Sequence, residues 1–398
     1  MLVKKIRKPV PTDSQSWHFQ RRFTGVIAGL FSFSCLASLP AQAVDRFSLT
    51  IGTKENWDSN FARNAAVDSE HYTQSTASLR LNQKLSKQQF SAGVSGNDYR
   101  HKLREDLDVS FYEGDASWRS EWSSRVKTAI SWQRDAYAVD RLEFADRDVV
   151  ARDNLTGQLT LGGSGRIGFT FGARQIAQTH SNSLRDVLDY DEDEGFAAIT
   201  YTRATQSFLS VRLREGERQY KYPFTNESLL LDFDYRQLEL EGAWALSRKT
   251  QLGFTLGRFD RDGQINAGTG TQAQINMDWA ITEKLKLSVD FSQSEPALGE
   301  TSDSPAVIRS SRLVAGWEPT AKWLLSMSAG YSRLSYLLRE TEPARDENIL
   351  SFSPLNITYR ISDNLRLRLD GQWVNRESPL AYRDYDYALA SFGATLAF

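Results

Sequence analysis

Residues 285–291 read Leu-Lys-Leu-Ser-Val-Asp-Phe and place an apolar side chain at every second position. Because successive side chains of a β-strand point to opposite faces, this spacing predicts a strand with one apolar face. The same alternation recurs along the chain after residue 43. It is found in Leu79 and Leu81; Phe90, Ala92 and Val94; Val126, Thr128, Ile130 and Trp132; Ile167, Phe169 and Phe171; Leu209, Val211 and Leu213; and Leu365, Leu367 and Leu369.

Two kinds of break separate these segments, in alternation. Short turns are expected near Lys87, Glu121, Ser164, Ala204, Arg248, Glu283, Ala321 and Asp363. Longer polar segments are expected near Ser59, Asp98, Tyr137, Asp186, Tyr222, Gly263, Glu300, Thr341 and Ser378. The spacing gives one hairpin per ~40 residues, which favours about 18 membrane-length strands over a propeller with four strands per blade.

Composition is compatible with a membrane β-barrel. The 398 residues are 40% hydrophobic and have a mean hydropathy of −0.48, which excludes a bundle of apolar membrane helices. Tryptophans cluster beside the predicted breaks, as in Trp118, Trp244 and Trp317 beside short turns and Trp57 and Trp373 beside long ones. Two interfacial aromatic girdles explain this better than the core of a soluble sandwich. The fold class predicted is all-β, a transmembrane outer-membrane antiparallel β-barrel.

Residues 1–43 are expected to be a signal peptide. Basic residues precede the apolar run 23–39, and Ala41-Gln-Ala43 has the small residues of a cleavage site. Cleavage would remove the single cysteine, Cys35, and would take six basic residues and one acidic residue from totals of 48 and 50. The remaining chain, 44–398, is then one barrel domain with a net charge near −7. That charge disfavours a nucleic-acid partner.

The chain ends in an alternating strand, Phe392-Gly-Ala394-Thr-Leu396-Ala-Phe398. A terminal strand that closes on Phe resembles the signal read by the outer-membrane barrel assembly machinery, which is therefore an expected partner. A sheet can satisfy its backbone in lipid only as a closed ring, so we expect a closed barrel in the bacterial outer membrane with both termini periplasmic.

The mature chain resembles the EpsL-type outer-membrane barrels of exopolysaccharide biosynthesis and export. The resemblance is carried by the stretches 58–61 (Asp-Ser-Asn-Phe), 114–118 (Gly-Asp-Ala-Ser-Trp), 144–153, 317–322 (Trp-Glu-Pro-Thr-Ala-Lys) and 382–387 (Tyr-Arg-Asp-Tyr-Asp-Tyr). It implies a pore through which an exopolysaccharide chain leaves the cell, handed over by a periplasmic polysaccharide-export partner. It marks no functional residue.

Polar residues opposite the apolar stripe are expected to line a lumen. The candidates are Arg212, Arg214, Asp232, Asp234, Arg366, Arg368 and Asp370. Pairing around the loop near Tyr222 is expected to set Arg212 and Arg214 beside Asp232 and Asp234. Such a set either forms a salt-bridge ladder that stiffens the wall or offers weak hydrogen bonds to sugars, with Tyr385 and Tyr387 as stacking surfaces.

The acidic stretch 186–195 lacks the glycine and glutamate positions of a calcium loop. We interpret it as a solvated surface loop, with shared divalent ions of lipopolysaccharide as the alternative. The histidines His71, His101 and His180 lie near long loops without a nucleophile motif, so no enzyme, metal or cofactor is expected. A diffusion porin for small solutes is the second hypothesis, although no inward-folded constriction loop can be located, and an outer-membrane hydrolase is the third.

Overall fold

The computed structural model describes residues 47–64, 67–162, 166–203, 207–222, 231–297, 305–337 and 344–398. The expected signal peptide, residues 1–43, lies outside these ranges. In the described ranges, no helix combines the length and the apolar character needed to cross a membrane.

Eighteen strands form one antiparallel sheet. They are β1 (Phe47–Asp58), β2 (Glu70–Leu85), β3 (Gln88–His101), β4 (Val109–Ser123), β5 (Val126–Ala138), β6 (Val149–Leu161), β7 (Ile167–His180), β8 (Tyr190–Thr202), β9 (Phe208–Tyr220), β10 (Phe233–Ala245), β11 (Thr250–Gly263), β12 (Gly268–Ala280), β13 (Leu285–Ser294), β14 (Val307–Thr320), β15 (Trp323–Tyr336), β16 (Arg345–Arg360), β17 (Leu365–Glu377) and β18 (Tyr385–Ala397). Among the described residues, three short 3-10 helices, η3 (Glu105–Leu107), η4 (Ser183–Leu188) and η5 (Ala381–Arg383), lie in long loops.

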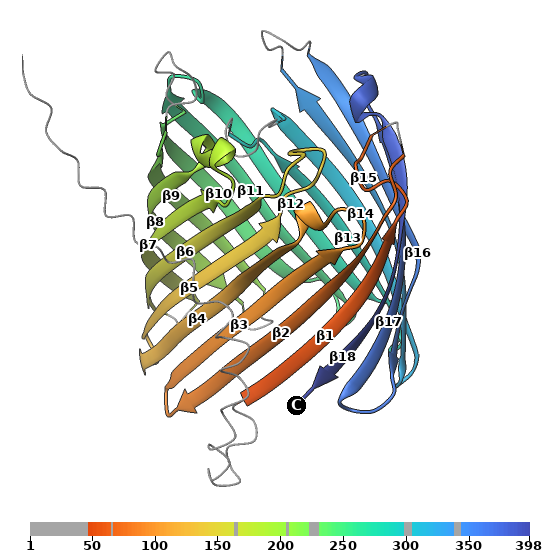
Figure 1. Cartoon of the computed structure of the whole chain (residues 1–398). Coiled ribbons are helices and arrows are strands. Elements are labelled where there is room, and N and C mark those ends of the chain that lie inside the picture. The colour runs from red at the N-terminus through yellow and green to blue at the C-terminus, as the bar shows by residue number, and fades with distance from the viewer. Residues whose placement is uncertain are drawn as a thin grey trace, which may run out of the picture. The chain divides into compact units, whose positions relative to one another are not determined.

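The sheet closes on itself because β1 pairs with both β2 and β18. The backbone N–H of Phe398 donates to the carbonyl of Leu49 at 2.8 Å and completes the seam. Figure 1 shows the tilted strands, with the C-terminus beside the start of β1. The predicted closed barrel and its strand number are confirmed.

Short turns gather at one end of the barrel and long loops at the other (Figure 1). In outer-membrane barrels the short turns face the periplasm, so the long loops form the extracellular mouth. Four predicted break positions are displaced by a few residues, because Asp98, Glu121, Tyr137 and Gly263 lie inside β3, β4, β5 and β11. Strands β3 and β5 continue beyond the apolar stripe with polar side chains on both faces, so alternation stops before the strand does.

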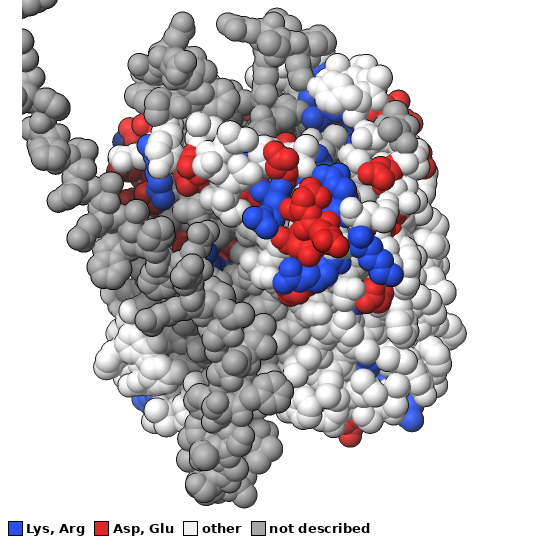
Figure 2. Space-filling view, in the orientation of Figure 1, with Lys and Arg blue, Asp and Glu red and all other residues white. Residues whose placement is uncertain are grey.

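The outward face carries an apolar band. On the side drawn in Figure 2, acidic and basic residues gather towards the long loops, and the wall below them is largely uncharged. Cross-strand register places eight tryptophans of the barrel on the outward face: Trp57, Trp118, Trp132, Trp244, Trp279, Trp317, Trp323 and Trp373. Trp122 packs edge-on against Trp118 on the same face. These rings lie where the amphipathic indole prefers the membrane interface.

One bulge changes the parity of a strand. The register of β16 shifts between Phe352 and Asn356, around Pro354, which has no N–H to donate to the ladder. Leu350 and Phe352 therefore point outward above the bulge, whereas Leu355 and Ile357 point outward below it.

Candidate functional site: the charged inner wall and the mouth loops

Strand β9 shows how the inner wall is built. Leu209, Val211 and Leu213 are exposed on the outward face, so Arg212 and Arg214 point inward. In the adjacent strand β10, Glu239 stands opposite Arg212 and Gln237 opposite Arg214. The period-two alternation thus presents guanidinium and carboxylate groups to the same interior surface.

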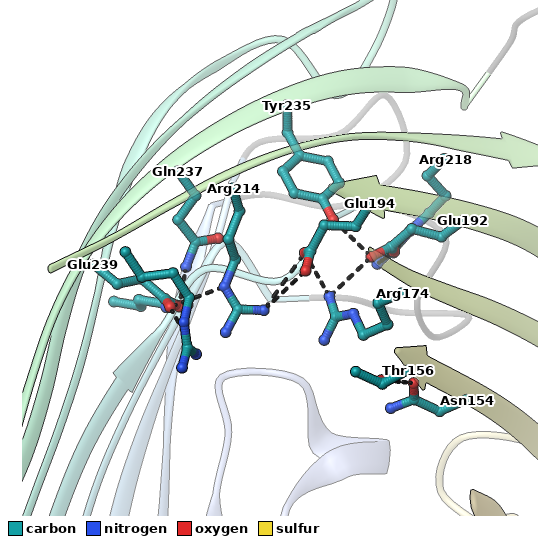
Figure 3. A network of polar contacts seen from close by, with 12 residues as sticks. Asn154, Thr156, Arg174, Glu192, Glu194, Arg214, Arg218, Tyr235, Gln237 and Glu239 are labelled. Atoms are coloured by element: carbon teal, nitrogen blue, oxygen red, sulfur yellow. Dashed lines mark hydrogen bonds and ion pairs between the residues drawn. The ribbon is translucent and has the colours of Figure 1, made fainter. Parts of the chain in front are cut away.

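Eight side chains from β7 to β10 form one alternating chain of acids and bases, here called the inner ladder. Its links are Glu241–Arg212 (3.3 Å), Arg212–Glu239 (3.6 Å), Glu239–Arg214 (2.9 Å), Arg214–Glu194 (3.2 Å), Glu194–Arg174 (2.7 Å), Arg174–Glu192 (3.3 Å) and Glu192–Arg218 (2.6 Å). Figure 3 shows most of these side chains pointing towards one another on the inner wall. Four positive and four negative groups make the ladder electrically balanced.

The carboxylates of the inner ladder become more buried towards the mouth. The side chain of Glu241 is 34% exposed, whereas those of Glu194 and Glu192 are 1% and 3% exposed. The Tyr235 hydroxyl oxygen lies 2.9 Å from Glu192 and 2.8 Å from Glu194, so its single proton is shared between the two carboxylates. Buried carboxylates need such partners because burying a charge without compensation is costly.

The prediction that Asp232 and Asp234 lie beside Arg212 and Arg214 was wrong. Asp234 has the parity of Leu238 and Leu240 and faces outward, where it stands opposite Glu217 and Asp262. Asp232 precedes β10, and its carboxylate accepts a hydrogen bond from the Tyr220 N–H. The reason is parity: β10 rises beyond the apolar band, so its outward positions, Asp234 and Arg236, are charged near the mouth.

The acidic stretch was also misinterpreted as a surface loop. Residues 190–195 belong to β8, and Glu192 and Glu194 point inward into the inner ladder. Sequence reasoning therefore missed these two acids and Arg174. The signal available was the alternation of Glu192, Glu194 and Phe196 with Asp191, Asp193 and Gly195, which continues the parity of Ile199 and Tyr201.

A basic patch lies on the inner wall nearer the short turns. Arg366, Arg368 and Asp370 point inward from β17, and Arg360 of β16 stands opposite Arg366. Lys54 of β1 and Arg368 both stand opposite Gly393 of β18. Asp370 accepts from Arg368 at 2.8 Å. The basic patch thus has four cationic groups and one carboxylate.

The loop between β5 and β6 crosses inside the mouth. Asp140 lies 3.8 Å from the Arg63 Nε, and Arg63 stacks 3.6 Å above the Tyr387 ring, which points inward from β18. Four strands, β1 to β4, separate β5 from β18 in the ring. The loop therefore narrows the opening rather than projecting away from it.

Neighbouring loops hold this crossing loop in place. The Arg147 guanidinium donates to the Asp108 carbonyl at 3.2 Å, and Arg185 of η4 pairs with both Glu143 and Asp148. Asp108 itself accepts from the His101 N–H at 2.7 Å, which holds the pKa of its carboxyl below the ordinary value.

Two further loops lean inward. Ala297, after β13, is buried against Phe233 and Tyr235 of β10. Glu347 of β16 is fully buried and receives the guanidinium groups of Arg345, Arg376 and Arg383. Arg383 lies in η5, so this cluster fixes the last loop to the inner wall.

Within the described residues, no group of three or more His, Cys, Asp and Glu side chains could hold a metal ion. The arrangement offers charged and hydroxyl groups along a passage, which suits weak contacts with a moving solute.

Comparisons with known proteins agree with the architecture. No protein-family model and no curated protein matches the sequence. The structure resembles Pseudomonas aeruginosa OpdL, with a TM-score of 0.50 at 11% identity over 89% of this chain and 98% of that one. It also resembles P. aeruginosa OpdQ, with a TM-score of 0.50 at 10% identity over 89% of this chain and 98% of that one. The structure of P. aeruginosa OpdK with vanillate gives a TM-score of 0.50 at 10% identity over 89% of this chain and 99% of that one. With its apolar outer band and closed ring of strands, the chain is an outer-membrane β-barrel of the bacterial cell envelope.

Proposed function

We propose that the chain is a diffusion channel for small hydrophilic solutes with a preference for anions. The observation that carries the proposal is the crossing loop between β5 and β6, which reaches Arg63 and the β18 wall and narrows a polar passage. A narrowed mouth restricts passage to small molecules, whereas a sliding polymer needs an open path.

The anion preference rests on the basic patch. Lys54, Arg360, Arg366 and Arg368 meet one carboxylate, Asp370, whereas the inner ladder on the opposite part of the wall is balanced. Excess fixed charge of one sign raises the local concentration of oppositely charged solutes in a pore.

Export of an exopolysaccharide, which the EpsL resemblance implies, has no structural observation in its favour. An exopolysaccharide substrate and a periplasmic export partner would be expected only if the chain exports polymer. Deleting the gene separates the two: we expect reduced uptake of small anions and unchanged secreted polysaccharide. Lost secretion with normal uptake would favour export.

Reconstitution tests the proposed channel directly. In planar bilayers under a KCl gradient, we expect a reversal potential that indicates anion selectivity. The double variant Arg366→Gln, Arg368→Gln should reduce that selectivity, while Arg236→Gln, on the outward face, should not. Replacing residues 140–146 by a short Gly-Ser linker should raise single-channel conductance. A barrel that inserts normally but conducts no ions would refute the proposal.

A further inference from the structure

Two arginines stand directly opposite each other on the outward face of the barrel. Arg309 of β14 pairs in register with Arg333 of β15. They share the parity of Leu313 and Met327, which are exposed on the outward face. Both arginines are exposed as well, so they face the membrane side of the wall rather than the lumen.

Register fixes the height of this pair relative to the apolar band. The row containing the arginines reads Gln293, Arg309, Arg333 and Asn348 across β13 to β16. The row one step nearer the membrane centre reads Phe291, Ser311, Tyr331 and Leu350. Two residues of a strand rise about 7 Å, so the guanidinium groups lie at the upper edge of the apolar band, at headgroup level.

The local charge is positive. Like charges directly opposite each other destabilise a sheet. The Arg333 guanidinium pairs with Asp346 at 2.7 Å, whereas the Arg309 Nε donates to the neutral Gln293 at 2.9 Å. In the described part of the wall, the pair of guanidinium groups thus shares one ion-paired carboxylate.

Arg236 provides a contrast on the same outward face. It stands opposite Glu215 in the register and pairs with it at 2.8 Å. Its charge is balanced by its cross-strand neighbour, whereas Arg309 and Arg333 oppose each other.

The wall beneath the arginine pair has a polar notch. Ser311 interrupts an otherwise aromatic and aliphatic row between Phe291 and Tyr331. Below it, Leu313 and Ala329 continue the apolar surface. A small hydroxyl side chain under two guanidinium groups leaves room for a phosphate, while apolar side chains below it contact acyl chains.

We propose that Arg309 and Arg333 bind the phosphate of an outer-leaflet lipid, such as the phosphorylated disaccharide of lipid A. Guanidinium forks match phosphate oxygens in a bidentate manner and form charge-assisted hydrogen bonds. The ligand comes from the membrane because the site faces lipid. The site is independent of what the pore conducts.

Native mass spectrometry of the purified full barrel, titrated with bisphosphorylated lipid A, tests this site. We expect retention of lipid A by the wild type and about tenfold weaker retention by the double variant Arg309→Gln, Arg333→Gln. Dephosphorylated lipid A should be retained no better by the wild type than by the variant. Arg236→Gln is the matched control and should bind lipid A like the wild type. Heat-modified migration in gels confirms that each variant folds.

Two further experiments, competition with inorganic phosphate and addition of EDTA, test the source of the phosphate and the role of divalent cations. Millimolar inorganic phosphate should not displace lipid A, and full displacement would identify a free-phosphate site instead. Binding should persist in EDTA. Loss in EDTA would place binding at the outward carboxylate row of Asp193, Glu217, Asp234 and Asp262, bridged by divalent ions. Equal retention by the double variant would also overturn the proposal.

Discussion

Replacing Glu194 by glutamine tests whether the inner ladder stabilises the barrel. Glu194 is 1% exposed and accepts from Arg174 at 2.7 Å, from Arg214 at 3.2 Å and from Tyr235 at 2.8 Å. The amide keeps one acceptor oxygen and removes the charge, so both arginines lose their shared counter-ion.

The size of the effect follows from burial. Removing one partner of a buried ion pair costs about 3 to 5 kcal/mol, because the remaining charge stays away from water. Arg174 and Arg214 keep Glu192 and Glu239 as second partners, at 3.3 Å and 2.9 Å. We therefore expect a loss of about 3 kcal/mol in the free energy of unfolding, at the lower end of that range.

Reversible denaturant unfolding of the barrel in detergent or lipid vesicles measures this loss. Glu241→Gln is the matched control at the exposed end of the same ladder, where its side chain is 34% exposed. Exposed pairs contribute about 0 to 1 kcal/mol, so the control should unfold almost like the wild type. Equal midpoints and slopes for the two variants would refute the claim that burial decides the strength of the ladder.

Two other predictions concern the membrane face and the mouth. Val211→Arg puts a charge into the apolar band and should cost about 2 to 4 kcal/mol near the midplane, seen as a lower unfolding midpoint than that of Val211→Leu. Because the hydrogen bond from His101 lowers the pKa of Asp108 in the folded state, its stabilisation is present above the ordinary carboxyl pKa and is lost as pH falls through the lowered value. Protection of the amides of residues 101–108 from hydrogen exchange, relative to their intrinsic exchange rates, should fall below about pH 4, and Asp108→Asn should remove that pH dependence. A pH dependence unchanged in Asp108→Asn would assign it to another group.

The alternation of apolar and polar residues was the sequence pattern that predicted most of the structure. Alternation in segments such as 285–291 and 365–369 gives the strands, their lipid-facing sides and, by counting breaks, the ring of strands. It also assigns Arg366, Arg368 and Asp370 to the inner face, where the structure places them. Each of these inferences depends on one strand and its neighbour, which local sequence specifies.

Register near the mouth could not be predicted in the same way. The apolar stripe ends at Leu213 in β9 and at Leu238 in β10, and beyond it the aromatic residues of β10, Phe233 and Tyr235, lie on the inward face. The hydrophobic contrast in β10 therefore reverses between Tyr235 and Leu238, so alternation alone did not tell the outward Asp234 from the inward Glu239, and the wrong carboxylates were assigned to Arg212 and Arg214. Loop crossings such as Asp140 to Arg63 join segments more than 70 residues apart, and alternation has no information about them.

Strand length explains why the inner ladder and the outward arginine pair both lie towards the long loops. A tilted strand crosses the hydrocarbon with about 9 to 11 residues, whereas β2 and β16 have 16. The additional strand residues extend towards the long loops, and their side chains face either the interior of the barrel or the lipid headgroups. On the inner side, acids such as Glu192 and Glu194 are buried among arginines, so changing one alters stability. On the outer side, Arg309 and Arg333 lie at headgroup level with Asp346 as their one ion-paired carboxylate, so changing them alters lipid retention and leaves the passage intact.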